Sequence, residues 1–382
     1  MADFNNIASI LLLLGAGQGI FFSLILFGWA KSNRRAYRWL GSFLILFSLS
    51  MIGTVLYDQR VVLIYPHLGL VSAPLGTAMG FMLYLYVKEL TEKDYRFVGW
   101  QWLHLLPALV SLTILTPFYL LPVDQKKTAM EASYAGFPML WKINFIFSTA
   151  VNSIYIIATI LTVTRHERHI RQLYSNTVNR SLIWVRHFLM AGVSTFFICI
   201  LMSMFDIARA DTISNLMFSF VIYVMGYRAL RQPEIFNDLP AQVVESTDEP
   251  AIIRIPVKYG KSGLNEDKAP VLICELDRLM SEEKLFLDPE LTLLELSQRL
   301  GIPAHQASQL LNQHKGQTFF DFINSQRVAY FKTAIVNPAN GHLSLLAIAL
   351  ESGFNSKAAF NSVFKRVTGM TPSQYKYSMT GR

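Results

Sequence analysis

The sequence predicts an all-α protein in two parts: a polytopic bundle of seven transmembrane helices and a cytoplasmic domain with two helix-turn-helix units. Three observations lead to this prediction. Hydrophobic residues make up 52% of the 382 residues and charged residues only 16%, whereas soluble globular proteins have about 25% charged residues. The long apolar runs all lie in the first 231 residues. The last third instead shows helical periodicity and an internal repeat.

Seven apolar runs in the N-terminal part are each close to the roughly 20 residues that a helix needs to cross the hydrocarbon core of a bilayer. They cover residues 8–30, 39–57, 67–88, 102–121, 141–163, 185–207 and 213–230. The first run is too long for the apolar core of a signal peptide and follows no basic stretch, so we expect a spanning helix there. Prolines in the third and fourth runs are compatible with spanning helices when neighbouring groups satisfy the freed carbonyls.

Positive charges in the loops predict the orientation of these helices. The loops after the first, third and fifth runs are rich in lysine and arginine, as is the segment after the seventh run, and the opposite loops contain few such residues. We therefore expect the N-terminus outside and the C-terminal part in the cytoplasm. The apolar part has a formal net charge of +9, more than the +8 of the whole chain, since residues 1–231 contain 19 Lys and Arg against 10 Asp and Glu. The net charge of the whole chain is therefore no evidence for nucleic-acid binding.

The chain between the two parts is polar. Residues 232–270 contain five prolines and are predicted to link the membrane part, residues 1–231, to the C-terminal domain, residues 271–382. The linker is either an extended tether or, at residues 252–257, a short strand or docking segment.

Two stretches of the C-terminal domain repeat one pattern at a separation of 52 residues. Each has a small residue, Ser297 or Ala349, followed four positions later by a glycine, Gly301 or Gly353. In a helix-turn-helix unit a small residue lets the two helices approach closely, and the turn needs a left-handed conformation that glycine adopts without strain. The repeat therefore predicts two such units.

The second helix of each unit is the one expected to enter the major groove of DNA. These helices are predicted at about 303–313 and 356–368, and Ser356 has the residue type of an N-cap. Three apolar residues of the later helix are spaced for the core: Phe360, Phe364 and Val367. Its opposite face is polar, small and cationic, as a groove-facing helix requires.

A family resemblance supports this prediction. Residues 353–375 read GFNSKAAFNSVFKRVTGMTPSQY and resemble the C-terminal signature of the AraC/XylS family of bacterial transcription regulators. Residues 310–327 are similar to the first half of the family's domain and its linker helix. The resemblance covers about residues 285–377. It implies seven helices, with two helix-turn-helix units joined by a helix near 318–334 and reading DNA in successive major-groove segments. The fused apolar part resembles a subgroup with membrane-embedded N-termini, which implies a location in the bacterial cytoplasmic membrane.

The resemblance also implies which residues contact DNA. The expected contacts are His305, Gln306, Ser308 and Gln309 in the first unit, Ser356, Lys357, Ala358, Asn361 and Ser362 in the second, and Lys365 and Arg366 on phosphates. The second helix has no arginine or glutamine facing the groove, so the first is expected to dominate base reading. A bidentate contact of Gln309 to adenine would contribute about 1–3 kcal/mol of discrimination. Residues 342–382 contain five Lys and Arg against one Glu, which gives the local positive charge that DNA binding needs.

Several polar or small residues lie within the apolar runs. His104, Asn144 and Asn152 are candidates for ligand sensing, and the alternative is structural hydrogen bonding. A stripe of small residues follows one face of the third run: Gly69, Ala73, Gly76 and Gly80. This stripe predicts close helix packing, either within one bundle or between two copies of the chain.

Together these patterns predict a membrane-embedded one-component transcription regulator whose activity is controlled by a signal sensed in the membrane part. The expected partners are double-stranded DNA, the lipid bilayer, RNA polymerase, a second copy of the chain and an unidentified signal ligand. No Ser/His/Asp or paired-carboxylate arrangement stands out, so we predict no enzyme activity, no metal and no other cofactor. One alternative is a transporter or channel with a cytoplasmic regulatory module. Another is a receptor whose last domain binds protein instead of DNA.

Overall fold

The computed structural model describes residues 2–28, 34–92, 95, 97–136, 138–178, 180–204, 216, 217, 219, 220, 224, 227, 228, 264 and 266–380. All named secondary-structure elements among these residues are helices. The chain forms two compact units, which we describe separately: residues 1–165 with 182–252, and residues 166–181 with 253–382. The sequence patterns had not indicated that residues 166–181 belong with the C-terminal unit.

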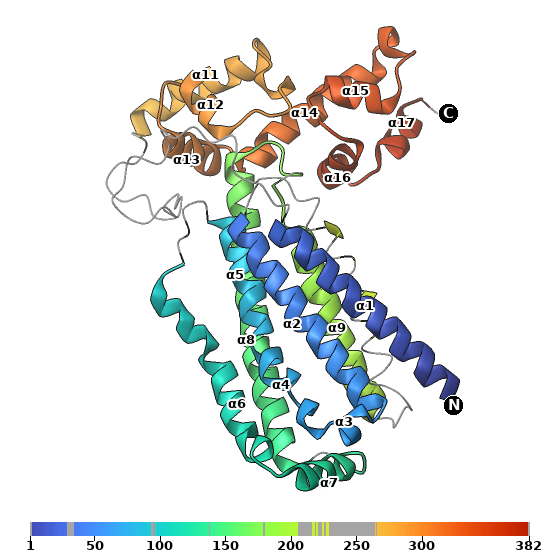
Figure 1. Ribbon diagram of the computed structural model, residues 1–382. Helices are drawn as coiled ribbons and strands as arrows, with labels where there is room; N and C mark the ends of the chain where they lie inside the picture. Colours follow the sequence, from blue (N-terminus) through green and yellow to red (C-terminus); the bar gives the residue numbers. More distant parts are fainter. Residues whose placement is uncertain are drawn as a thin grey trace. The chain divides into compact units, whose positions relative to one another are not determined.

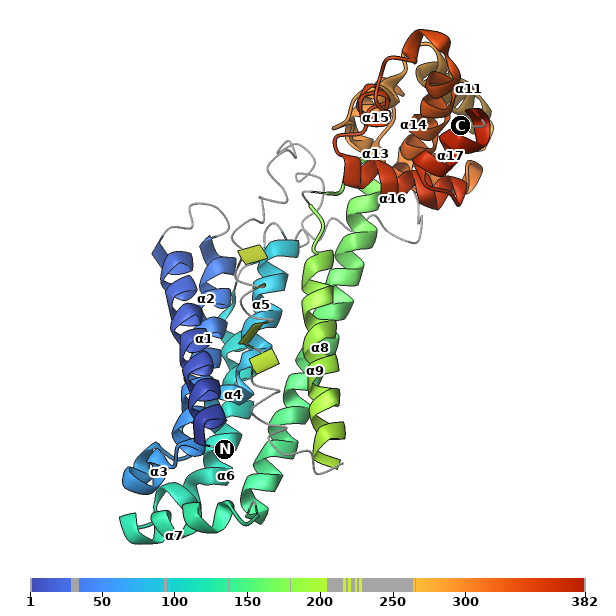
Figure 2. The same ribbon diagram turned by 90° about the vertical axis from the view of Figure 1, so that its right-hand side faces the viewer.

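The N-terminal unit is a bundle of helices in which α1 and α2 pack along each other (Figures 1 and 2). The helices from this part of the chain are α1 Ala2–Gly28, α2 Arg34–Asp58, α3 Val61–Ile64, α4 Ser72–Thr77, α5 Met79–Thr91, α6 Leu106–Tyr119, α7 Val123–Ser133, α8 Met139–Leu173 and α9 Ile183–Met204. Helix α8 ends in the C-terminal unit, because residues 166–173 belong to that unit.

Among the described residues, five helical segments are long and apolar enough to cross a membrane, and they coincide with the first five predicted runs. They are Ile7–Gly28, Arg34–Asp58, Pro66–Thr91, Gly99–Tyr119 and Met139–Leu173. The sixth predicted run coincides with α9. The seventh, residues 213–230, lies largely outside the described residues, so the count of seven spans stays a prediction.

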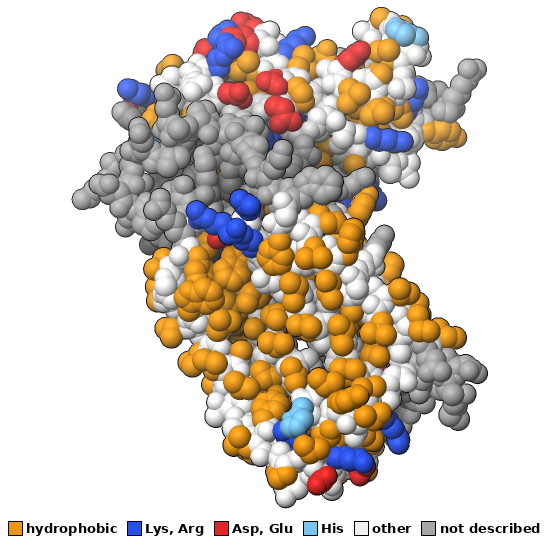
Figure 3. All heavy atoms as spheres, viewed as in Figure 1, with side chains coloured by type: hydrophobic (Ala, Val, Ile, Leu, Met, Phe, Trp, Pro, Cys, Tyr) orange, Lys and Arg blue, Asp and Glu red, His pale blue; other side chains and the backbone are white. Residues whose placement is uncertain are grey.

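The N-terminal unit is apolar on its outside as well as in its core. Leu40, Leu44 and Tyr86 are buried in its interior. Many large apolar side chains, including those of Leu14 and Ile146, are exposed, and hydrophobic side chains cover most of its visible face in Figure 3. Helices that are apolar on all sides are typical of a protein core or a membrane.

The C-terminal unit contains the seven helices that the family resemblance implies. They are α11 Ala269–Ser281, α12 Leu293–Arg299, α13 Ala304–His314, α14 Phe319–Val336, α15 Leu345–Glu351, α16 Lys357–Thr368 and α17 Pro372–Thr380. The predicted linker helix near 318–334 is α14, and its N-cap Thr318 accepts a hydrogen bond from the Asp321 backbone N–H.

Helix α14 joins two separate hydrophobic cores. Phe319, Phe322 and Ile323 contribute to the core of the first helix-turn-helix unit. One turn later Val328 and Phe331 contribute to the core of the second. Because one rigid helix contributes to both cores, its position affects how the two helix-turn-helix units are placed relative to each other.

Candidate nucleic-acid interface

The two predicted turns have the geometry that the repeat requires. Gly301 and Gly353 have positive φ angles of 64° and 89°, the left-handed region that favours glycine. The small residues Ser297 and Ala349 are both buried, which lets the helices on either side of each turn approach closely. The sequence-based prediction of two helix-turn-helix units is confirmed at these four residues.

Helix α13 is the second helix of the first unit, and it is more enclosed than the sequence suggested. His305 and Gln306 are half-buried. Ser308 and Gln309, which as expected DNA contacts would have to lie on an exposed face, are instead buried. The Gln309 carboxamide accepts a hydrogen bond from the Leu264 backbone N–H at 3.0 Å and donates one to Gln313 at 2.9 Å.

The burial of Gln309 has a physical cause that lies outside α13. Leu264 is itself buried and belongs to the hydrophobic core of the first unit. Leu264, which lies 45 residues earlier in the sequence, therefore covers Gln309, and helical periodicity within α13 carries no information about this contact.

Helix α16, the second helix of the second unit, presents the predicted polar face. Its N-cap Ser356 is half-buried and accepts a hydrogen bond from the Ala359 backbone N–H at 3.2 Å, which confirms the predicted cap. The remaining candidate base-contact residues of this helix are all exposed: Lys357, Ala358, Asn361 and Ser362. This face is therefore accessible to a major groove.

The core face of α16 differs from the prediction at one residue. Phe360 and Phe364 are buried as predicted, but Val363 takes the third core place and Val367 is 44% exposed. The reason is that Val367 lies in the last turn, one residue before the helix ends at Thr368. Tyr375 packs on Phe364 beyond this point, with the ring centroids 5.4 Å apart.

The two predicted phosphate contacts have different surroundings. Lys365 is exposed. Arg366 forms an ion pair with Asp321 at 2.9 Å, and its guanidinium lies 5.0 Å from the centre of the Phe320 ring. Asp321 and Phe320 both belong to α14, so Arg366 connects α16 to the linker helix.

Arg327, which none of the sequence patterns singled out, is the largest fully buried side chain of the described residues. Its guanidinium donates hydrogen bonds to the backbone carbonyls of Phe286 at 2.7 Å and Asp288 at 2.6 Å. Burial lowers the pKa of Arg327 to about 10, an effect that the carboxylates of Asp288 and Glu290 partly offset, so the side chain is charged at neutral pH. The sequence does contain a signal for this burial. Arg327 lies four residues from both Ile323 and Phe331, which places it on the buried face of the helix.

The three candidate sensing residues of the N-terminal unit bind different partners within the protein. Asn144 accepts a hydrogen bond from the Ser111 hydroxyl at 2.7 Å, and the His104 ring lies 2.7 Å from the Tyr155 hydroxyl. Asn152 accepts from the Gly80 backbone N–H at 2.8 Å. These bonds supply the structural hydrogen bonding that was the alternative to ligand sensing.

The stripe of small residues serves packing within the bundle at one of its positions. A Cβ atom added to Gly80 would lie 2.7 Å from the Asn152 side chain and 2.9 Å from Cβ of Tyr155. Gly80 therefore allows α5 to approach α8 closely.

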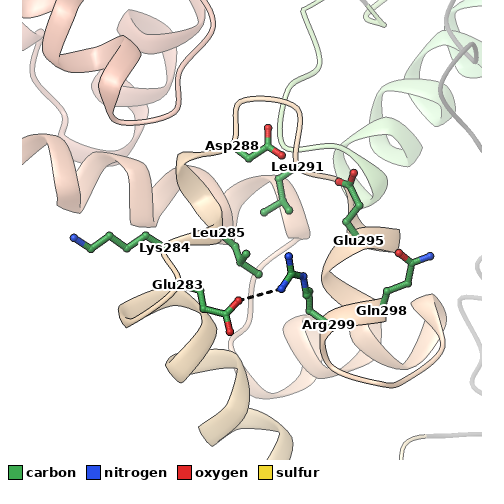
Figure 4. Close-up of a pocket in the computed structure, with 8 residues that line it drawn as sticks. All are labelled: Glu283, Lys284, Leu285, Asp288, Leu291, Glu295, Gln298 and Arg299. Atoms are coloured by element: carbon green, nitrogen blue, oxygen red, sulfur yellow. Dashed lines mark hydrogen bonds and ion pairs between the residues drawn. The ribbon is translucent and has the colours of Figure 1, made fainter.

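A surface pocket of the C-terminal unit has an acidic lining, shown in Figure 4. Its residues are Glu283, Lys284, Leu285, Asp288, Leu291, Glu295, Gln298 and Arg299. Glu283 and Arg299 form an ion pair at 3.3 Å. With three carboxylates against Lys284 and Arg299, the lining has a formal charge of −1 and offers no cationic surface for phosphates.

Comparison with known proteins agrees with this geometry. Residues 296–378 match the family described as "Helix-turn-helix domain". They are an AraC-type helix-turn-helix domain. This helix-turn-helix domain includes both glycine turns and the helices α13 to α16.

Two similar proteins are both named as regulators. An uncharacterized HTH-type transcriptional regulator of Staphylococcus aureus strain COL is 31% identical over 124 residues, which are 32% of this chain and 15% of that protein. The TCP pilus virulence regulatory protein of Vibrio cholerae serotype O1 is 35% identical over 69 residues, 18% of this chain and 24% of that protein. The chain thus spans only about 15% of the length of the first of these relatives. No solved structure matches the chain.

Proposed function

We propose that this protein is a membrane-embedded one-component transcription regulator. Its helix-turn-helix domain binds double-stranded DNA through both units, and a signal that reaches the apolar helices controls this binding. The observation that carries the proposal is the exposed polar and cationic face of α16 in an AraC-type domain. The apolar outer surface of five long helices supports the membrane location.

The two units contribute unequally to base reading in this proposal. Lys357 and Asn361 of α16 are exposed and can reach a groove without rearrangement. Gln309 of α13 can do so only if its contact with Leu264 opens. In this proposal the second unit therefore contacts base edges directly, and Gln309 of the first unit contributes once its contact with Leu264 opens. RNA polymerase, a second copy of the chain and the signal ligand are further partners that the proposal expects.

DNA binding can be tested on the full chain in lipid nanodiscs, by selecting genomic fragments across a salt series. We expect a two-part DNA motif whose affinity falls steeply with salt. Lys357→Ala should weaken binding to all sequences and lower the salt slope by about 1, whereas Asn361→Ala should cost about 1–3 kcal/mol at one base position. Arg299→Ala, in the acidic pocket, is the matched control and should change neither quantity. Salt-independent binding, or none, would favour the protein-binding alternative.

The proposed location is the bacterial cytoplasmic membrane, with the C-terminal domain in the cytoplasm. Cys274 is free and exposed in α11, so it can report the side of the membrane directly. In a Cys199→Ser variant, a membrane-impermeant maleimide should label Cys274 in inverted vesicles but not in intact spheroplasts. The opposite labelling pattern would reverse the orientation, and loss of the protein from carbonate-washed membranes would exclude a spanning protein.

A further inference from the structure

The loop between α8 and α9 packs against the rest of the C-terminal unit through several buried contacts. We call residues 174–178 and 180–181 the interhelix loop. Tyr174 forms an antiparallel bridge with Thr292. The next residue, Ser175, donates to the Leu291 carbonyl from both its backbone N–H, at 3.2 Å, and its hydroxyl, at 2.7 Å. Tyr174 and Ser175 are both buried, so this contact excludes water.

A second set of contacts joins the interhelix loop to the linker helix α14. Asn324 donates to the Ser175 carbonyl at 2.9 Å. Arg327 donates to the Ser175 hydroxyl at 3.0 Å. Ser175 thus supplies acceptors for a buried guanidinium, and losing them would leave charged donors without partners, which is costly.

Charged and amide groups complete the contact. Arg180 forms an ion pair with Glu290 at 3.3 Å, and its guanidinium stacks over the Tyr174 ring, 4.1 Å from the ring centre. The Arg180 side chain is only 7% exposed, whereas that of Glu290 is 54% exposed, so solvent reaches this pair from the Glu290 side. Asn176 donates to the same Glu290 carboxylate at 2.8 Å.

The interhelix loop binds where the two helix-turn-helix units meet. Glu290, from the first unit, also accepts a hydrogen bond from Asn355 at 3.5 Å, and Asn355 directly precedes the N-cap of α16. The Arg327 guanidinium lies 5.9 Å from the centre of the Phe354 ring, in the turn of the second unit. The interhelix loop therefore lies where the first helix-turn-helix unit, the second unit and α14 contact one another.

We propose that the interhelix loop is an intramolecular clamp that fixes the relative placement of the two helix-turn-helix units, so that docking of the loop sets the affinity for a two-part DNA site. Because α8 and α9 are the helices on either side of this loop, a rearrangement of either one reaches the junction directly. This inference rests on the proposed function, since it concerns how DNA binding is controlled. A clamp that holds both units in place lowers the ordering cost of binding both half-sites at once. It leaves binding to a single half-site unchanged.

The experiment uses the full chain in lipid nanodiscs and compares affinities for the two-part site and for one half-site. Arg180→Glu repels Glu290 from within the loop and alters no residue of the helix-turn-helix domain. We expect the ratio of two-part to half-site affinity to fall about fivefold or more. Glu290→Arg in the same chain should restore part of this loss through the reversed ion pair, while the hydrogen bonds that Glu290 accepts from Asn176 and Asn355 stay lost. Arg168→Glu makes the same change of charge at an exposed position of α8 and should leave the ratio within about twofold, because long-range charge alone is screened.

Hydrogen exchange of residues 174–178 measures the docking itself without DNA. In the wild type the Ser175 amide should be protected, and in Arg180→Glu the protection should decrease. A ratio that stays the same, or protection that does not change, overturns the proposal. If the Arg180→Glu protein does not fold, Asn176→Ala takes its place with an expected fall of about threefold from one lost hydrogen bond. Failure of the wild type to bind any DNA contradicts the proposed function instead, and the exchange result still decides whether the loop docks.

Discussion

Replacing Arg327 with alanine is expected to destabilise the C-terminal unit by about 3–5 kcal/mol, because the change leaves several buried hydrogen-bond acceptors without a donor and opens a cavity. The carbonyls of Phe286 and Asp288 and the hydroxyl of Ser175 would all lose a donor. The variant should also lose affinity for a two-part DNA site, since these groups hold the junction of the two units.

The measurement must report on this unit alone. All six tryptophans lie at or before residue 184, so tryptophan fluorescence follows the other part of the chain. Pulse proteolysis across a urea series, followed with an antibody to the C-terminus, measures the unfolding of residues 264–380. Arg299→Ala is the matched control: this arginine is 61% exposed and paired with Glu283, so its loss should cost less than about 1 kcal/mol. Equal effects of the two substitutions would show that Arg327 is not essential to the unit.

The second large effect is expected for Gly353→Ala, which combines backbone strain with a steric clash. Gly353 has a φ angle of 89°, and an added Cβ atom would overlap the Phe286 carbonyl oxygen and lie 3.0 Å from Nε of Arg327. Neither neighbour can move freely, because the two are hydrogen-bonded to each other. We expect a loss of about 3 kcal/mol or more, within the range for overpacking plus an unfavourable backbone conformation.

Two other glycines separate the strain from the clash. Gly301 and Gly369 have φ angles of 64° and 75°, and an added Cβ atom at either would meet nothing within 4 Å. Their alanine variants should therefore lose only about 1–2 kcal/mol, the cost of a left-handed conformation. The same urea series compares all three variants. If Gly353→Ala were no worse than the other two, the close packing of the second turn against Phe286 and Arg327 would be refuted.

Much of the helix-turn-helix domain could be predicted from the sequence because its signals are local. Gly301 and Gly353 mark the turns, Ser356 caps α16, and the periodic apolar residues place α16 within one residue of its observed bounds. The family resemblance implied α14 near 318–334, within two residues of its observed bounds. The first five apolar runs likewise coincide with five long helices. The residue types themselves impose these features through backbone conformation, capping and apolar periodicity.

Only the tertiary structure decided which side chains are accessible and which distant segments meet. Gln309 lies on a helix predicted correctly, yet Leu264 covers it. Arg327 is buried because carbonyls from the segment before α12 and from the interhelix loop surround it, more than 35 and 150 residues away in sequence. Burial depends on contacts between segments that are far apart in the chain. A periodic pattern within one helix predicts which of its faces is apolar, but it does not predict which other segment covers a polar face. The sequence by itself thus determined the helices and their turns, and the packing of separate segments determined which of their faces remain open to DNA.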